Sequence, residues 1–509
     1  MSQVSSVRAA GTAEGAVESP RGPSAWLLVA LASAGCIAIA LVSGTHLGLV
    51  LVVIPIVIAM TWQSPRTMIA VMPVWMALLG LVRRLTPGGG NITFSGDPVL
   101  LIGPVVIILL FIIAMSRGAS QNRTRFATVV GSLSIIALLE AFNPKQGTLL
   151  TGLGGLLFIL VPMLAFWIGR ALVDDELALQ LVKTVAILSL IASVYGLIQQ
   201  FHGLPSWDQR WISTKGYSAL AVGQAAIHAF GTFSSAQEYA AFLSIGLVAW
   251  LALLGKSTRM LGPLHVVATA TVATALWFES ERTAVFLTVL AIGVMFAARL
   301  RLRPIGVIAG GVGAVFLLIF VAGHFGAGAS GTAGALSNHV VKGVSGPFSA
   351  GSSLPGHIRA TKLGIRQGIV NPFGHGTGTV TIASNRYSHS RTVGTEFDPG
   401  NMGIAFGIFG LIFYVLLVWY AIKTTYIAAV RRRDAVGLFG IGMLMATLFQ
   451  WTNGDLYSVC WLIWLFLGYL DMALLRGAAS PEPEPVLASP EAGFTWRRPG
   501  EVRRQGTGE

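Results

Sequence analysis

Long apolar runs alternate with short polar stretches along most of the chain. A helix that spans the hydrocarbon core of a bilayer takes roughly 17–25 mostly apolar residues. By that rule the runs predict about fourteen transmembrane helices, or twelve to fourteen because several runs are short. They lie at about residues 26–43, 47–62, 67–82, 98–115, 126–142, 153–170, 181–200, 239–254, 263–278, 283–298, 305–322, 401–421, 436–451 and 456–474. The pattern predicts an all-α, polytopic membrane protein, with one pair of short runs open to a re-entrant arrangement.

The composition supports the same class. Of the 509 residues, 54% are hydrophobic and only 11% are charged, whereas soluble domains carry about 25% charged residues. The two cysteines, Cys36 and Cys460, both lie inside apolar runs, so they imply no disulfide framework.

Many of the basic residues are clustered in the loops between the apolar runs. The formal net charge is +13, with 34 Lys and Arg residues. If the N-terminus is cytoplasmic and the runs alternate in direction, the basic clusters 116–125, 255–259, 298–304 and 430–434 all fall in the cytoplasm, as insertion favours. We therefore expect a multi-pass protein of the plasma membrane with both termini in the cytoplasm, and no nucleic-acid partner.

Both ends of the chain lack the apolar pattern. Residues 1–24 are rich in Ala, Gly and Ser, and residues 476–509 are rich in Pro and charge. Such segments have little to bury and are expected to be disordered. Because residues 1–24 are polar and precede the first run, a cleaved signal peptide is not expected. The predicted membrane domain is therefore 25–475.

Two predicted outer segments, 201–238 and 323–400, are longer than simple connectors. The second is expected to contain short helices, including one within 353–370, where apolar residues keep roughly helical spacing. It is also basic, with only Glu396 and Asp398 set against Lys342, Arg359, Lys362, Arg366, Arg386 and Arg391. A cationic outer surface suits an anionic partner such as a lipid-linked phosphate. The alternative is a solvated loop that meets anionic lipid headgroups.

The stretch WFESERTAVF (277–286) places Glu279, Glu281 and Arg282 in a turn between two apolar runs. Ionised groups at a bilayer are costly, which makes them candidates for function. Arg282 suits a diphosphate, because its guanidinium stays protonated and presents a planar fork to phosphate oxygens. The structural alternative pairs Arg282 with Glu279 or extends it to the interface.

Two further stretches carry candidate chemistry. NPFGHGTGTV (371–380) has alternate glycines that suit a tight turn or a close backbone approach to a ligand, but it lacks the strand and helix of a nucleotide loop. Glu396 and Asp398 precede an apolar run, where a carboxylate either stabilises a helix N-terminus or acts as a general base. No zinc-type spacing of Cys and His occurs, so neither a metal nor another cofactor is expected.

In chain order, these pieces resemble the O-antigen ligase / O-antigen polymerase family of membrane proteins. Residues 229–247 look like its Gly-Thr-Phe stretch before a span, and 277–290 look like its Thr-x-Ser-Arg turn, matched here by residues 279–282. Residues 357–378 are similar to its Arg…Asn-Pro-(x)-Gly-x-Gly element, and 403–417 resemble the Gly-x-x-Gly-rich span that follows.

The resemblance covers about residues 180–420 and departs from the family at two points. His228 stands where the ligases carry an arginine before Gly-Thr-Phe, and EFDPGN stands where they carry a His-Asn pair. Some polymerases of the family place a glutamate near the second point, which favours a polymerase over a ligase. There Glu396 or Asp398 would replace the histidine base.

The resemblance implies a metal-independent, inverting glycosyltransferase on the outer face of the plasma membrane. It would move a glycan from a polyprenyl-diphosphate carrier to a sugar acceptor during synthesis of envelope polysaccharide. Arg282 would bind the diphosphate, assisted by Arg359 and Arg366, and the site would be completed by Arg210 and His228. The alternatives are a polytopic transporter or lipid-carrier flippase, and a non-catalytic scaffold for envelope assembly.

Overall fold

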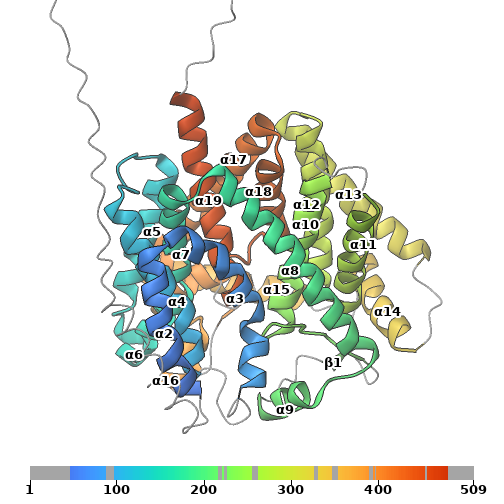
Figure 1. Cartoon of the computed structure of the whole chain (residues 1–509), viewed down its shortest axis with the longest axis horizontal. Helices are drawn as coiled ribbons and strands as arrows, with labels where there is room; N and C mark the ends of the chain where they lie inside the picture. Colours follow the sequence, from blue (N-terminus) through green and yellow to red (C-terminus); the bar gives the residue numbers. More distant parts are fainter. Residues whose placement is uncertain are drawn as a thin grey trace, which may run out of the picture.

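A computed structural model describes residues 46–86, 97–215, 221–222, 226–254, 262–325, 331–346, 354–388, 394–395, 397–452 and 456–479. Across these ranges the protein is a bundle of helices (Figure 1), apart from one antiparallel pair of two-residue strands. The predicted all-α class is therefore confirmed. The first predicted span, 26–43, the N-terminal tail, residues 480–509 and the basic cluster 255–259 lie outside the described residues. Residues 476–479, which were expected to belong to a disordered tail, continue α19 instead.

The elements follow one another in this order: α2 (His46–Gln63), α3 (Pro65–Leu85), η1 (Pro98–Leu101), α4 (Ile102–Ser116), α5 (Arg125–Glu140), η2 (Pro144–Gln146), α6 (Leu149–Phe158), α7 (Leu160–Leu172), α8 (Asp175–Phe201), α9 (Ser206–Lys215), β1 (Ala221–Val222), β2 (Ala226–Ile227), α10 (Ala236–Leu253), α11 (Gly262–Glu279), α12 (Arg282–Arg299), α13 (Pro304–Phe325), α14 (Gly331–Ser345), α15 (Leu354–Val370), α16 (Ile382–Tyr387), α17 (Asp398–Arg432), α18 (Ala435–Ala446) and α19 (Tyr457–Ala479).

Every predicted span from 47–62 onward coincides with a helix. Nine helices in the described ranges are long and apolar enough to cross a membrane, so the predicted total of about fourteen is not confirmed. Helix α18 is shorter than a full span, and the run at 153–170 is divided at Ile159 into α6 and α7. The helix expected within 353–370 is confirmed as α15, and α14 and α16 flank it.

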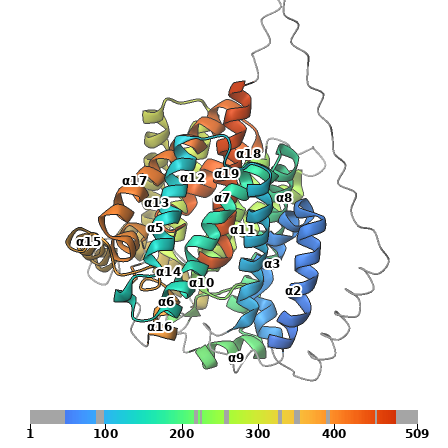
Figure 2. The same ribbon diagram turned by 90° about the vertical axis from the view of Figure 1, so that its left-hand side faces the viewer.

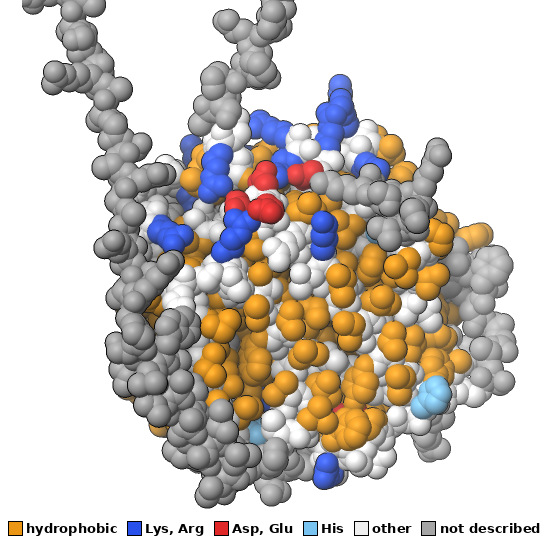
Figure 3. Space-filling model, in the orientation of Figure 1, with side chains coloured by type: hydrophobic (Ala, Val, Ile, Leu, Met, Phe, Trp, Pro, Cys, Tyr) orange, Lys and Arg blue, Asp and Glu red, His pale blue; other side chains and the backbone are white. Residues whose placement is uncertain are grey.

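The bundle has two chemically different ends and an apolar belt. Hydrophobic side chains cover its middle, and lysines and arginines gather at one end (Figure 3). That end holds the ion pair of Arg66 with Asp174 and the C-terminal Arg432 of α17, and we call it the basic end. The opposite end, where α3, α8 and α11 finish, holds α9, and we call it the α9 end (Figure 1).

Small residues allow the central helices to cross closely. A Cβ atom added to Gly169 on α7 would lie 2.0 Å from the carbonyl oxygen of Leu465, and one added to Gly468 on α19 would lie 1.8 Å from that of Phe166. Backbones in such contact gain packing that lipid tails cannot replace.

Helix α17 is interrupted in its first third. Gly407 there has φ 64° and ψ −151°, which breaks the helical hydrogen bonding. The segment that follows α15 fills the break: the amides of His375 and Gly376 donate to the carbonyl oxygens of Ile404 and Ala405, at 2.9 and 3.1 Å. Residues 371–376 therefore complete the broken helix from outside it.

Candidate functional site

The turn between α11 and α12 is held by Glu279. Its carboxylate is 1% exposed and turns inward, where Oε2 accepts a hydrogen bond from the Glu281 amide at 2.9 Å. Ser280, between them, has φ 67°, a left-handed conformation that non-glycine residues adopt only when their surroundings enforce it. The carboxylate thus fixes the backbone that begins α12.

His228 lies against this turn from the loop before α10. Its Nδ1 is 2.6 Å from the carbonyl oxygen of Glu279 and 3.5 Å from its Oε1. A carbonyl oxygen only accepts, so Nδ1 is the protonated nitrogen and Nε2 carries the lone pair of the neutral ring. Burial lowers the pKa of His228, but its bonds to Glu279 outweigh burial, and the net direction of the pKa is upward.

Arg282 turns away from Glu279 and toward α14. Its Nε donates to Nε2 of His339 at 3.2 Å, and the His228 and His339 rings meet edge to face with centroids 5.9 Å apart. Burial, Arg282 and His228 together lower the pKa of His339 to about 4, so this imidazole is neutral at pH 7 and accepts the bond. We call Arg282, His339 and His228 the turn cluster.

Arg282 is a partly buried cation without an acidic partner among the described residues. In the part of the chain that the structure describes, no carboxylate forms an ion pair with its guanidinium. The pairing of Arg282 with Glu279, one of the two structural alternatives raised by the sequence, is not found. Within the described ranges the Nη groups of the fork therefore have no anion to neutralise them, although arginines near a membrane normally pair or reach water.

Helix α14 is fixed to the turn by more than Arg282. Trp277, near the end of α11, donates from Nε1 to the hydroxyl of Ser337, two residues before His339, at 3.1 Å. The long segment after α13 is thus attached to the 279–282 turn through two side chains.

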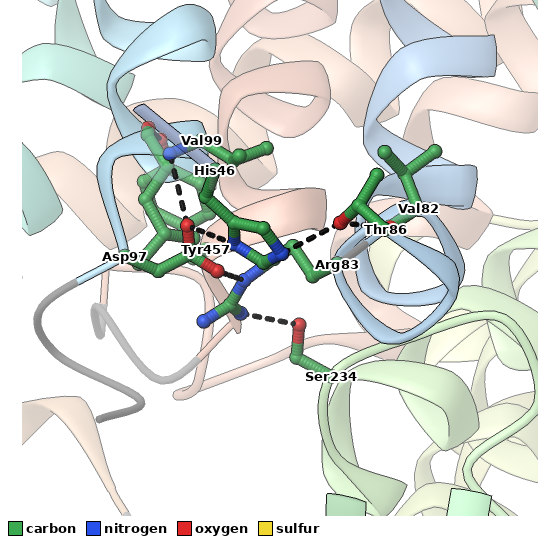
Figure 4. A network of polar contacts seen from close by, with 9 residues as sticks. His46, Val82, Arg83, Thr86, Asp97, Val99, Ser234 and Tyr457 are labelled. Carbon is green, nitrogen blue, oxygen red and sulfur yellow. Dashed lines mark hydrogen bonds and ion pairs between the residues drawn. The ribbon is translucent and has the colours of Figure 1, made fainter. Parts of the chain in front are cut away.

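A second polar network lies at the same α9 end, between α2, α3 and the start of η1 (Figure 4). Arg83 donates from Nε to Oδ2 of Asp97 at 2.5 Å, and His46 contacts Oδ1 of the same carboxylate at 2.8 Å. Although burial raises the pKa of Asp97, His46 and Arg83 outweigh it, and the pKa falls to about 2. The other nitrogen of His46 bonds the Thr86 hydroxyl at 2.6 Å.

The two arginines that end α3 also hold the Gly-Thr-Phe loop. Arg84 donates to the carbonyl oxygens of Phe233 and Gly231, at 2.7 and 2.6 Å, and its Nε lies 3.0 Å from Asp208 on α9. Arg83 donates to the Ser234 hydroxyl at 3.0 Å. This role of Arg83 and Arg84 was not predicted from the sequence. Its signal was a pair of arginines at the predicted outer end of the 67–82 span, where a short loop is not expected to be basic.

The alternate glycines of 371–380 serve close packing within the chain. Gly374 and Gly376 have φ of 67° and 101°, and a Cβ at Gly374 would lie 2.3 Å from the Ala405 carbonyl oxygen. A Cβ at Gly378 would lie 2.2 Å from the carbonyl oxygen of Thr151 on α6. The predicted tight turns are confirmed. The close backbone approach is to α6 and to the break in α17, and not to a ligand as the sequence alternative had it.

Of the two candidate bases near the start of α17, the structure describes one. Glu396 lies outside the described residues. Asp398 is 0% exposed, and its Oδ2 accepts from the Thr452 amide at 3.1 Å and from the Tyr414 hydroxyl at 3.4 Å. These bonds tie α17 to the loop before α19, which favours a structural role for Asp398.

The remaining predicted cations are on other elements. Arg359 and Arg366 are exposed on α15, and Arg210 is exposed on α9, which packs beneath α3. Of the predicted phosphate ligands, His228 and Arg282 are therefore the two that the structure brings to one turn. Among the described residues, no three His, Cys, Asp or Glu side chains are grouped to hold a metal ion.

Comparison with known proteins adds no relative: no family model and no curated protein matches the chain.

Proposed function

We propose that this protein is a membrane glycosyltransferase that takes a glycan from a polyprenyl-diphosphate carrier, and that Arg282 binds the diphosphate. The resemblance of residues 180–420 to the O-antigen ligase / O-antigen polymerase family suggests this reaction. The α9 end is then the outer face of the plasma membrane, where envelope polysaccharide is assembled, and both chain termini are cytoplasmic. The polymerase reaction is favoured over the ligase reaction.

The observation that carries the proposal is the partly buried Arg282 whose only bond in the described structure goes to a neutral histidine. His339 holds Nε and thereby orients the fork without neutralising its charge. A diphosphate supplies the missing anion, and two fork nitrogens bind phosphate oxygens in parallel. Charge that develops on the diphosphate as the sugar departs would be stabilised by this fixed cation.

His228 is the group best placed to accept the proton of the sugar hydroxyl. Its Nδ1–H is held by Glu279, so Nε2 presents a lone pair, and the bonded Glu279 stabilises the imidazolium that forms. In the transfer, the acceptor oxygen forms a bond to the anomeric carbon and its proton passes to Nε2. The bond from that carbon to the diphosphate oxygen breaks, and its electron pair stays on the diphosphate. Attack from the side opposite the diphosphate inverts the anomeric centre.

One observation favours the transporter alternative. Broken helices often form the binding sites of transporters, and α17 is broken at Gly407. However, the carbonyl oxygens of Ile404 and Ala405 at the break accept hydrogen bonds from 375–376. The transferase therefore remains the better account.

The test is turnover of carrier-linked glycan in membranes that contain Arg282 variants. Arg282→Ala removes the charged donor that binds the leaving diphosphate, and is expected to lower the rate of transfer about 100-fold or more. Arg282→Lys should also lose most activity, since lysine lacks the fork. Arg299→Ala, at the basic end of the same helix, is the matched control and should keep wild-type turnover. Wild-type turnover in Arg282→Ala at equal membrane content would overturn the proposal.

A further inference from the structure

Helix α15 presents one face to the protein and the opposite face outward. Its inner face is made of Gly364 and Gly368, at which an added Cβ would lie 2.7 Å from the Cα atoms of Gly400 and Gly403 on α17. These glycines let the two backbones touch, so α15 lies flat on the first part of α17 at the edge of the bundle (Figure 2).

The outward face of α15 is cationic. Arg359, Lys362 and Arg366 are all exposed, at a spacing of three and four residues that puts them on one side of the helix. The helix contains no acidic residue. Within the described ranges no carboxylate pairs with any of the three cations. Three like charges are thus kept close together at the surface.

Large apolar side chains accompany these cations. Leu363 is 54% exposed and Val370 is 67% exposed, and Phe373, just beyond the helix, is 69% exposed. The ring of Phe373 lies 6.1 Å from that of Phe409. From Phe409 an exposed apolar stripe continues along α17, through Ile412, Val415, Leu416 and Trp419.

This arrangement points to a position at the boundary between water and hydrocarbon. The α17 stripe runs along a candidate membrane span, so it faces lipid tails. Because Phe373 continues that stripe, the adjoining α15 lies at headgroup level, where its cations and its exposed apolar side chains share one outward face.

We infer that the outward face of α15 is a binding surface for anionic phospholipid headgroups of the leaflet at the α9 end. Charge complementarity selects this occupant, because clustered Lys and Arg beside a membrane attract anionic lipids over zwitterionic ones. The surface is separate from the turn cluster, and the inference does not depend on the proposed glycosyl transfer.

The test measures which lipids lie next to α15. The full chain, with Cys36 and Cys460 replaced, carries a bimane fluorophore at Leu363→Cys in vesicles of phosphatidylcholine and phosphatidylglycerol. Brominated phosphatidylglycerol should quench the label at roughly tenfold lower mole fraction than brominated phosphatidylcholine. A label at Val415→Cys on the lipid-facing stripe of α17 is the matched control, and both lipids should quench it equally.

Two measurements then show whether the cations cause the preference. The preference for phosphatidylglycerol should disappear in the triple variant Arg359→Gln/Lys362→Gln/Arg366→Gln. In the protein with all three cations, the preference should also disappear in 1 M salt, where the screening length falls to about 3 Å. Quenching by both lipids should persist there. Equal quenching by the two lipids, or no quenching at position 363, would overturn the inference. So would displacement of phosphatidylglycerol by trace polyprenyl diphosphate, which would assign the surface to the carrier.

Discussion

The Nε of Arg282 and the Nε2 of His339 are 3.2 Å apart, and this bond joins the 279–282 turn to a helix 57 residues further along the chain. Both groups are basic, so the bond forms only while His339 is neutral. The pKa of about 4 for this imidazole ensures that state at neutral pH. The guanidinium is thereby oriented by a neighbour that leaves its charge uncompensated.

The depressed pKa of His339 predicts a loss of stability in acid. Between its ordinary pKa of 6.5 and about 4, the unfolded chain binds a proton at this histidine that the folded protein does not. The free energy of unfolding should therefore fall as pH decreases from 6.5 to 4, and the contribution of this group should level off below 4. Thermal unfolding in detergent across this range measures the slope.

His339→Gln supplies the comparison for that measurement. Glutamine can accept from Arg282 but does not titrate, so the variant should show a shallower dependence on pH in the same window. A variant that loses stability with pH as steeply as the wild-type protein would show that His339 is not the group responsible.

The buried bond between Arg83 and Asp97 predicts a large effect of removing one charge. Both side chains are 1% exposed, and Asp97→Asn would leave the Arg83 cation without its carboxylate. Breaking a buried pair in this way costs about 3–5 kcal/mol of unfolding free energy. Asp97 also caps η1 through the Val99 amide, a bond that asparagine preserves.

Asp174→Asn is the matched control. Asp174 likewise caps a helix, through the Leu177 amide, but its ion pair with Arg66 is 48% exposed on both sides. Exposed pairs contribute about 0–1 kcal/mol, so this variant should unfold almost as the wild-type protein does. Equal losses in the two variants, measured by denaturant titration in detergent, would contradict a buried ionic bond at Asp97.

The segment that fills the break in α17 predicts that Gly374 tolerates no side chain. Alanine there would face a φ of 67° and a Cβ placed 2.3 Å from the Ala405 carbonyl oxygen. The left-handed conformation alone costs about 1–2 kcal/mol, and the clash adds to it. Gly356→Ala, on α15 with no atom within 4 Å of the added Cβ, should change stability by at most about 1 kcal/mol. Similar unfolding midpoints for the two variants would contradict the packing.

The bond between His228 and Glu279 predicts the pH dependence of transfer. A base acts when unprotonated, so activity should rise with pH, and the raised pKa of His228 puts the midpoint above 6.5. Glu279→Gln removes the carboxylate charge, one of the groups that raise this pKa, and should move the midpoint downward, while the bond to the backbone carbonyl of residue 279 remains. The initial rate measured from pH 5 to 9 gives both midpoints. A midpoint unchanged by Glu279→Gln would contradict a role for His228 as the base.

The sequence predicted the helices well, because the cost of burying unpaired backbone in lipid makes hydropathy a direct guide to spans. It also singled out Arg282, because charge in a turn between two apolar runs is apparent from the sequence. His228 was singled out for another reason: it stands where the ligases that the chain resembles carry an arginine. It did not predict that Glu279 turns inward to His228, or that Arg282 turns outward to His339. His339 is 57 residues away, and nothing in the local pattern selects it from the other histidines of the long segment.

Glycine patterns were informative only in part. The alternate glycines at 374, 376 and 378 indicated a close approach, but local sequence cannot say what approaches, and here it is the backbone of α6 and α17. Arg83 and Arg84, near the end of α3, were unusual for a predicted outer boundary, but the local sequence does not reveal what they bind. Their partners, Asp97 and the Gly-Thr-Phe loop, come together only in the folded bundle.

The most direct test of the account is the affinity of the purified protein for a short-chain polyprenyl diphosphate, compared between wild type and Arg282→Gln by isothermal titration calorimetry at pH 7. Removal of a charge-assisted fork is expected to weaken binding about tenfold to a hundredfold, because hydrogen bonds to charged groups contribute about 1.5–3 kcal/mol. Arg299→Gln should bind as tightly as the wild-type protein. Equal affinities for wild type and Arg282→Gln, with both variants folded, would contradict the assignment of the diphosphate to the turn cluster.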